Sequence, residues 1–342
     1  MGVLDKINKQ NILPKLMLSI TEKRIFNNKG DKMKIIESED VRNIYISLNY
    51  YCNNECLMCG VPFNKHNKYN EGMEFYVNEI NKIPFKIEPN DIITLSGGEP
   101  FMFLEIWKLI EYIRENFKCR IMIFTNGRVL KNKEVVDKLV YYEIDKLVIP
   151  FFSYKQSVYN NIAGSSNAYQ EVCQALHNLN KTDLYHEVKF LPMRQNATDI
   201  EETYIFIKNE FPKTIFTLCG VQYFGQAVTN VELIGIQYSM LKEELEKTFD
   251  TAIEKYNEII PLYRFPMCVL DPIYWRNGVV TLFQEYIIGP DYSDVKLSDD
   301  NKQKFEIPET CVNCIGTCDW YSNKYEKLWG TKELKTMRCG NE

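Results

Sequence analysis

The sequence predicts an α/β fold, in which helices cover a parallel sheet, followed by a smaller cysteine-rich domain. Segments with strand character alternate with amphipathic helical segments from residue 43 to about residue 260. Polar motifs that contain glycine or cysteine follow the first three strands directly. Residues 265–342 hold five of the chain's 11 cysteines and show little regular periodicity. These three observations together predict the fold class.

Six segments have strand character. In the first, NIYISL (43–48), Ile44, Ile46 and Leu48 alternate with other residues and so lie on one face of a strand. The other five are short apolar runs bounded by turn signals. They are DIITLS (91–96), CRIMIFT (119–125), IDKLVIPFF (144–152), EVKFLPM (187–193) and TIFTLCGVQYF (214–224).

A helical segment follows each predicted strand. In the clearest one, residues 103–116, Leu104, Trp107 and Ile110 are spaced to lie on one helix face. The others are residues 72–83, 132–142, 167–180, 199–211 and roughly 237–259. Six strand–helix repeats indicate a parallel sheet with right-handed crossovers. Periodicity leaves open whether that sheet curls into a barrel or forms an open doubly wound sheet.

Composition narrows the class of protein. The 342 residues are 45% hydrophobic and 25% charged, with a net charge of −5, which gives no overall electrostatic attraction for nucleic acid. No apolar run reaches the ~18 residues that span a bilayer, and no secretory signal is present. We therefore expect a cytoplasmic protein without a membrane partner. Clustered cysteines in that compartment are more often metal-binding or catalytic than disulfide-bonded.

Cys52, Cys56 and Cys59 form a C-x3-C-x2-C array directly after the first strand. A structural zinc site needs four ligands, so the array can be read as part of one. A [4Fe–4S] cluster also normally takes four thiolates, one for each iron. With three protein ligands, one iron is left for a ligand that the protein does not supply.

Two further motifs follow the second and third strands. In SGGEP, Gly97 and Gly98 remove side chains where another group must approach the backbone, and Glu99 presents a carboxylate. In TNG, Asn126 lies at the end of the third strand. Each motif alone fits an ordinary turn. The carboxyl ends of strands in an α/β barrel meet at one face, so both motifs and the cysteines are expected around one cavity.

This combination, over about residues 43–230, resembles the radical S-adenosylmethionine (radical SAM) superfamily. The resemblance implies a partial (β/α)6 barrel whose fourth iron is chelated by the amino and carboxylate groups of S-adenosylmethionine. It also implies that Gly97, Gly98, Glu99 and Asn126 bind this cofactor. The reduced cluster would then cleave S-adenosylmethionine to a 5′-deoxyadenosyl radical that abstracts hydrogen. Met58 departs from the family, which often has an aromatic residue there, and an adaptable methionine is expected to be tolerated.

Two polar residues after later strands are weaker candidates for the cofactor site. Ser153 follows the fourth strand and is placed to meet a ribose hydroxyl, and Asn196 follows the fifth. A helix cap or a turn is the simpler explanation for each. The sequence singles out no general acid or base.

The C-terminal cysteines form a second group. Cys268, Cys311, Cys314 and Cys318 are candidate ligands, and Cys339 could replace one of them. A structural zinc would fit this spacing. The arrangement also resembles the auxiliary-cluster domains of radical SAM peptide maturases, which implies a second [4Fe–4S] cluster that transfers electrons.

The segments PFFSYKQSVYNNIAG, FGQAVTN, FPMCVL and CVNCIGTCDWYS resemble, more narrowly, the His-Xaa-Ser system maturases. This implies a ribosomally made peptide substrate, a flavodoxin-type or ferredoxin-type electron donor and possible help from a separate leader-binding protein. A sugar or nucleoside substrate is the alternative. A third possibility is an α/β binding protein that has a structural zinc site and no catalytic activity. We expect an N-terminal extension (1–42), a barrel (43–260) and an auxiliary-cluster domain (261–342).

Overall fold

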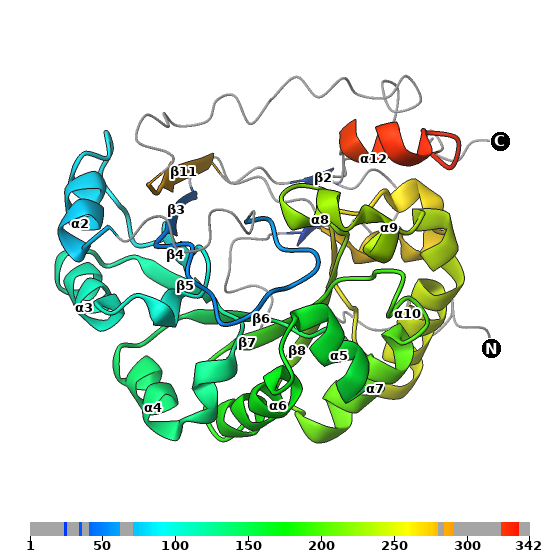
Figure 1. The fold of residues 1–342 in the computed structure, drawn as a ribbon, viewed down its shortest axis with the longest axis horizontal. Helices are drawn as coiled ribbons and strands as arrows, with labels where there is room; N and C mark the ends of the chain where they lie inside the picture. The colour runs from blue at the N-terminus through cyan, green and yellow to red at the C-terminus, as the bar shows by residue number, and fades with distance from the viewer. Residues whose placement is uncertain are drawn as a thin grey trace.

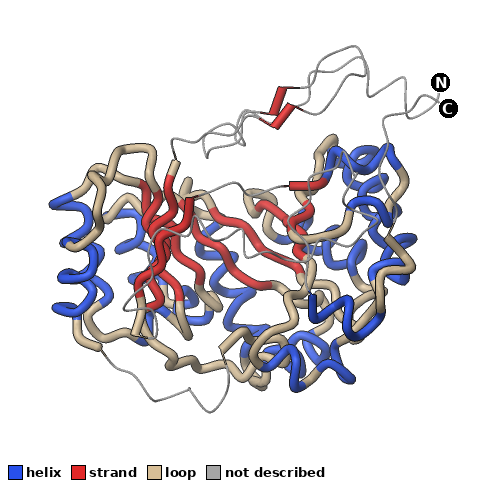
Figure 2. Tube along the Cα trace, turned by 90° about the horizontal axis from the view of Figure 1, so that it is seen from above, coloured by secondary structure: helices blue, strands red, loops and turns tan. Residues whose placement is uncertain are grey.

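The computed structural model describes residues 24–25, 34–35, 41–61, 71–279, 284–290 and 323–334. Its main feature is a curved sheet with helices along its outer side (Figures 1 and 2). The described part of the N-terminal extension is a short antiparallel pair, β1 (Arg24–Ile25) with β2 (Lys34–Ile35). Cys311, Cys314, Cys318 and Cys339 lie outside the described residues.

All six predicted strands are confirmed, and each pairs in parallel with the next along the chain. They are β3 (Arg42–Ser47), β4 (Ile92–Ser96), β5 (Arg120–Phe124), β6 (Lys146–Pro150), β7 (His186–Phe190) and β8 (Ile215–Cys219). A doubly wound sheet would reverse its strand order at a switch point. This sheet keeps the sequence order from β3 to β8, which identifies it as a partial barrel.

The six predicted helices are also present. They are α2 (Met73–Asn81), α3 (Ile106–Asn116), α4 (Lys133–Tyr141), α6 (Ala168–Leu179), α7 (Ile200–Glu210) and α10 (Lys242–Tyr256). Figure 1 shows them as an outer arc around the strands. Within the described ranges, four more α-helices were not predicted: α5 (Gln156–Ala163), α8 (Gln226–Thr229), α9 (Val231–Ile234) and α12 (Asn323–Trp329). No helix in the described ranges has the length and apolar character needed to cross a bilayer.

Residues after 260 extend the sheet at both of its edges. On one side β9 (Leu262–Tyr263) pairs with β8, and β10 (Gly278–Val279) pairs with β9. On the other side β11 (Gln284–Ile288) pairs in parallel with the first barrel strand, β3. The two-residue strands β9 and β10 are too short to show a period, and β11 lies in a segment read as irregular, so the sequence did not predict these three strands. The first part of the segment expected to be an auxiliary domain thus continues the barrel sheet.

The two faces of the sheet differ in chemistry. Residues that point outward, such as Ile44 and Leu95, are fully buried beneath the helices. Inward residues are often polar, and Thr94 Oγ1 donates to Asn43 Oδ1 at 2.6 Å. Because side chains alternate along a strand, the main apolar core packs on the outer face, and the inner face carries polar residues beside apolar ones such as Met122, Phe124 and Val148.

A buried carboxylate fixes the start of the sheet. Asp91, which is fully buried just before β4, accepts bonds from Arg42 N at 3.0 Å, from Arg42 Nη2 at 2.6 Å and from Glu88 N at 2.7 Å. Its replacement would leave the partly buried Arg42 guanidinium without its anion. We expect Asp91→Ala to lower the free energy of unfolding by about 3 kcal/mol, measured by urea denaturation.

Lys133→Ala is the matched control, because Lys133 pairs with Asp137 on the exposed surface of α4. Exposed pairs of this kind contribute little, so the change should stay below about 0.5 kcal/mol. Equal effects of the two variants would contradict a special role for Asp91.

Candidate active site

The cysteine loop, residues 48–61, leaves β3 at the carboxyl end of the sheet. In Figure 1 it is the dark blue trace inside the arc of strands. Burial raises the pKa of Cys52 to about 11, and it also raises the pKa values of Cys56 and Cys59. Cys59 and Cys52 raise the pKa of Cys56 further, so the three thiols are near enough to influence one another.

No group of three or more His, Cys, Asp or Glu side chains among the described residues is placed to hold a single metal ion. The ligands of a [4Fe–4S] cluster each bind a different iron and need not meet at one point. A metal must displace protons from thiols whose pKa is raised, so loading the loop would release protons.

Hydrogen-bond donors face the sulfurs of the loop. The backbone N–H of Asn54 donates to Cys52 Sγ, and that of Val61 donates to Cys59 Sγ, each at 3.4 Å. Asn126 Nδ2 lies 3.7 Å from Cys52 Sγ. Such bonds stabilise thiolate ligands and tune the potential of a bound iron–sulfur cluster.

The glycine–glutamate turn is pressed against the cysteine loop. Gly98 N donates to Asn49 O and Glu99 N donates to Tyr51 O, both at 2.6 Å. A Cβ at Gly97, whose φ is +123°, would lie 2.5 Å from Asn49 O, and one at Gly98 would lie 2.2 Å from Tyr51 O. The predicted close approach to these glycines is confirmed, and the approaching group includes the backbone of the cysteine loop.

Glu99 joins the ends of β4 and β5. Its buried carboxylate accepts bonds from Thr125 Oγ1 and Asn126 N, both at 2.7 Å, and from Phe101 N at 3.2 Å. Burial outweighs these bonds and raises the pKa of Glu99 to about 7. A cation near Glu99 would favour the charged form.

The end of β5 also holds the cysteine loop. Asn126 Nδ2 donates to Asn53 Oδ1 at 2.6 Å. Arg128 Nη1 donates to Asn54 Oδ1 at 2.9 Å and to Asn53 O. The sequence analysis did not identify Arg128, although this residue follows the TNG motif directly.

Two glycines, in the segments PFFSYKQSVYNNIAG and FGQAVTN, support the other side of the loop. Gly164 ends α5 with φ +63°, and a Cβ there would lie 2.4 Å from Glu55 O. Gly225 precedes α8 with φ +59°, and a Cβ there would lie 2.1 Å from Gly60 O. The available signal was a glycine after a short helix, which is a common helix end. The cysteine loop is thus fixed by β4, β5, α5 and α8.

Ser153 and Asn196 take part in a buried network after β6 and β7. Ser153 Oγ donates to Asp199 Oδ2 at 3.0 Å. Asn196 Nδ2 donates to Phe152 O at 2.7 Å, and its Oδ1 accepts from Met193 N at 2.6 Å. Both side chains therefore stabilise turns, which was the simpler explanation. Their contact with a ribose stays a prediction.

The Asn49 side chain supports the presence of a polar ligand. Asn49 is 2% exposed, and neither its Nδ2 nor its Oδ1 has a hydrogen-bond partner among the residues that the structure describes. Buried amides are nearly always hydrogen-bonded, so a bound polar group beside the GGE turn would complete this site. Three thiols, donors to sulfur and this amide fit a cluster with a polar cofactor. Cys268 is buried, and its proposed partner cysteines lie outside the described ranges.

Comparison with known proteins gives a family and a fold. The sequence profile of the radical SAM superfamily matches residues 46–207. No curated protein sequence matches the chain. Several solved structures of SuiB from Streptococcus suis have a similar fold.

The SuiB structure without a named ligand has a TM-score of 0.53 at 12% identity, covering 84% of this chain and 67% of SuiB. SuiB bound to S-adenosylmethionine has a TM-score of 0.51 at 15% identity, and the match covers 77% of this chain and 55% of SuiB. SuiB bound to the precursor peptide SuiA has a TM-score of 0.52 at 14% identity, and the match covers 64% of this chain. In that complex the match spans about half of the SuiB chain, 48%. These likenesses show the fold.

Gly98→Ala should displace the cysteine loop, because its Cβ would overlap the Tyr51 carbonyl. We expect iron bound per chain after anaerobic reconstitution to fall by more than half. Gly72→Ala is the control, since a Cβ there meets only Glu105 Oε2 at 3.7 Å and φ is ordinary at −76°. Full iron content in Gly98→Ala would show that this contact does not position the loop.

Glu99 should make the free energy of unfolding of the iron-free protein depend on pH. Its folded pKa, about 7, lies above the ordinary 4.5, so its stabilising contribution is complete below pH 4.5 and is lost as the pH rises through 7. The loss is on the order of 3 kcal/mol. Urea denaturation between pH 4.5 and 8 should show this trend in the difference between wild type and Glu99→Gln. A constant difference would contradict the raised pKa.

Proposed function

Because this chain belongs to the radical SAM superfamily, we propose that it is a peptide-modifying enzyme that cleaves S-adenosylmethionine reductively and abstracts hydrogen from a ribosomally made peptide. Membership of the superfamily makes it an enzyme that uses S-adenosylmethionine and a [4Fe–4S] cluster.

The observation that carries the proposal is a loop with three thiols that four elements of the barrel hold in place. Cys52, Cys56 and Cys59 would hold three irons and leave the fourth for the cofactor. When bound, the cluster supplies the electron that splits the sulfonium and yields a 5′-deoxyadenosyl radical. The chain's own contribution is to fix the thiols, to donate N–H bonds to two of the sulfurs and to exclude water.

The residues around the cysteine loop would bind the cofactor. Gly97, Gly98 and Glu99 lie against the loop, where the methionyl end is expected, and Glu99 offers a carboxylate to its ammonium group. Asn126 lies beside Cys52 and is placed for the same region. Ser153 and Asn196 remain candidates for the ribose.

A peptide substrate is supported by fold likeness to SuiB, which was solved with its precursor peptide SuiA. We also propose a second [4Fe–4S] cluster on Cys268, Cys311, Cys314 and Cys318, and a flavodoxin-type or ferredoxin-type electron donor. A separate leader-binding protein is a further proposed partner. A cytoplasmic location would keep the thiols reduced for cluster assembly.

Cys56→Ala tests the proposed chemistry. After anaerobic reconstitution and reduction with dithionite, we expect formation of 5′-deoxyadenosine, measured by chromatography, to fall to the assay background. The variant removes one of three cluster ligands. Cleavage at the wild-type rate would show that Cys56 does not hold the cluster.

Cys173→Ala is the matched control. Cys173 is also a partly buried thiol whose pKa burial raises to about 11, but it lies on α6 outside the cysteine loop. It should retain full cleavage. Transfer of deuterium from a labelled candidate peptide to 5′-deoxyadenosine would then identify a substrate, and transfer only from a sugar or nucleoside would contradict the peptide proposal.

A further inference from the structure

The inner face of the barrel encloses a cavity of about 480 Å³. It extends from Asn43 and Ile92, near the starts of β3 and β4, to Met58 and Phe224 beside the cysteine loop. None of the residues 97–99 or Asn126 lines it. The cavity is therefore a space next to the proposed cofactor site, where a substrate group could be held.

A charged array lies on the wall of this cavity. Glu187 on β7 is 2% exposed and lies between two lysines. Lys146 Nζ is 2.8 Å from Glu187 Oε2, and Lys189 Nζ is 3.6 Å from Glu187 Oε1. Burial by itself raises the pKa of Glu187, but the two ammonium groups outweigh it and hold the pKa below its ordinary value. The array thus has two positive charges and one negative charge.

Lys189 is the less satisfied of the two lysines. At 3.6 Å its ion pair with Glu187 is longer than an ordinary hydrogen bond, and it has no closer acceptor among the described residues. Its ammonium lies 4.5 Å from the ring centroid of Tyr263 and 5.7 Å from that of Phe124. These rings replace water around the charge but accept no conventional hydrogen bond. With one N–H directed toward Glu187, the other two are available to a bound anion.

A neutral amide belongs to the lining of the same cavity. Gln222, which follows β8, lines the cavity, and its buried Nε2 has no hydrogen-bond partner within the described residues. A buried amide without an acceptor is costly, and a carboxylate oxygen would satisfy it. A cation and an unpaired N–H donor on one wall are complementary to an anion.

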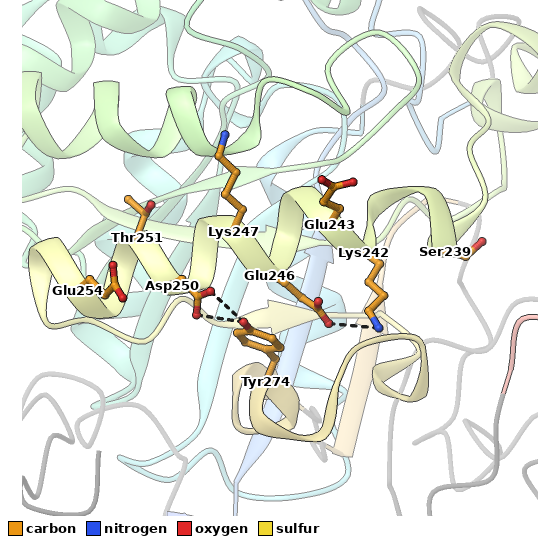
Figure 3. A pocket seen from close by; sticks show the side chains of 9 residues that line it. All are labelled: Ser239, Lys242, Glu243, Glu246, Lys247, Asp250, Thr251, Glu254 and Tyr274. Atoms are coloured by element: carbon orange, nitrogen blue, oxygen red, sulfur yellow. Dashed lines mark hydrogen bonds and ion pairs between the residues drawn. The ribbon is translucent and has the colours of Figure 1, made fainter. Parts of the chain in front are cut away.

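Another hollow, on the outer face of α10, lacks these features. In Figure 3, Lys242 lies 3.8 Å from Glu246, and Tyr274 donates to Asp250 at 3.0 Å. This hollow is larger, at about 610 Å³, but its lining carries four carboxylates against two lysines, which does not favour an anion. Size alone therefore does not identify the substrate site.

We propose that Lys189 and Gln222 bind a carboxylate of the substrate inside the barrel, so that the group presented to the radical belongs to an acidic substrate segment. Glu187 would hold the Lys189 ammonium on the cavity wall and limit its excess charge. This inference rests on the proposed function and names the chemistry of its substrate. Aspartate or glutamate side chains and a terminal carboxylate would all fit.

The test uses the reconstituted holoenzyme loaded with S-adenosylmethionine and two capped probes, acetyl-Ala-Glu-Ala-amide and acetyl-Ala-Gln-Ala-amide. Ligand-observed NMR titration under anaerobic conditions gives Kd for each. We expect the glutamate probe to bind about tenfold more tightly, a difference of about 1.4 kcal/mol. In Lys189→Met, the ratio of the Kd of the glutamine probe to that of the glutamate probe should fall to about one. Lys133→Met on the exposed face of α4 should leave the ratio unchanged.

Glu187→Gln alters the same charged array but should change probe binding in the opposite direction to Lys189→Met. It removes the competing anion, so the glutamate probe should bind more tightly than it binds to wild type. A general loss of folding cannot weaken binding in one variant and strengthen it in the other. Equal binding of both probes to wild type, or an unchanged ratio in Lys189→Met, would overturn the proposal.

The carboxylate of S-adenosylmethionine is the other anion that Lys189 could meet. If Lys189→Met weakens binding of S-adenosylmethionine and leaves the probe ratio intact, the lysine belongs to the cofactor site and the proposal is wrong. Failure of the proposed function itself would be seen differently, as the absence of 5′-deoxyadenosine formation by wild type. The probe titration does not depend on that reaction.

Discussion

The contact between the GGE turn and the cysteine loop is the constraint on which the site depends. Two backbone hydrogen bonds of 2.6 Å, from Gly98 and Glu99, bring the ends of β3 and β4 together. They are possible only because glycine has no Cβ to strike the Asn49 and Tyr51 carbonyls. Glu99 then continues the connection to β5, and Arg128 closes it by bonding back to the loop. A metal-binding loop without regular secondary structure thus acquires a fixed shape from its neighbours.

The division of the sheet into an apolar outer face and an inner face of mixed polar and apolar residues allows this site to exist. Stability comes from the branched residues packed beneath the helices, so the inner face is free to carry charges and amides. The array of Lys146, Glu187 and Lys189 would be costly inside a packed core, because buried ions need compensation. On a cavity wall each lysine stays partly exposed, and the two ammonium groups balance the negative charge of the glutamate between them.

Much of this architecture could be predicted from the sequence, because short strand segments bounded by turn signals alternate with amphipathic helices. The motif residues after β3, β4 and β5 were predicted to meet, and they do. Helix α5 was not predicted, although its C-terminal Gly164 supports the cysteine loop. The Lys146–Glu187–Lys189 array was also invisible. In IDKLVIP and EVKF these charges look like ordinary polar positions, and only the register of β6 against β7 brings them together.

The pairing of β11 with β3 has a consequence for how the chain reaches this fold. Gln284 pairs with Arg42, so strands 242 positions apart (284 minus 42) must meet to complete that edge. Contacts of such high sequence separation form slowly, because a long loop must close before they stabilise anything. During synthesis the β3 edge would stay open until residues 284–288 had left the ribosome. Open strand edges pair readily with other chains, so nascent copies would be vulnerable to aggregation during that interval.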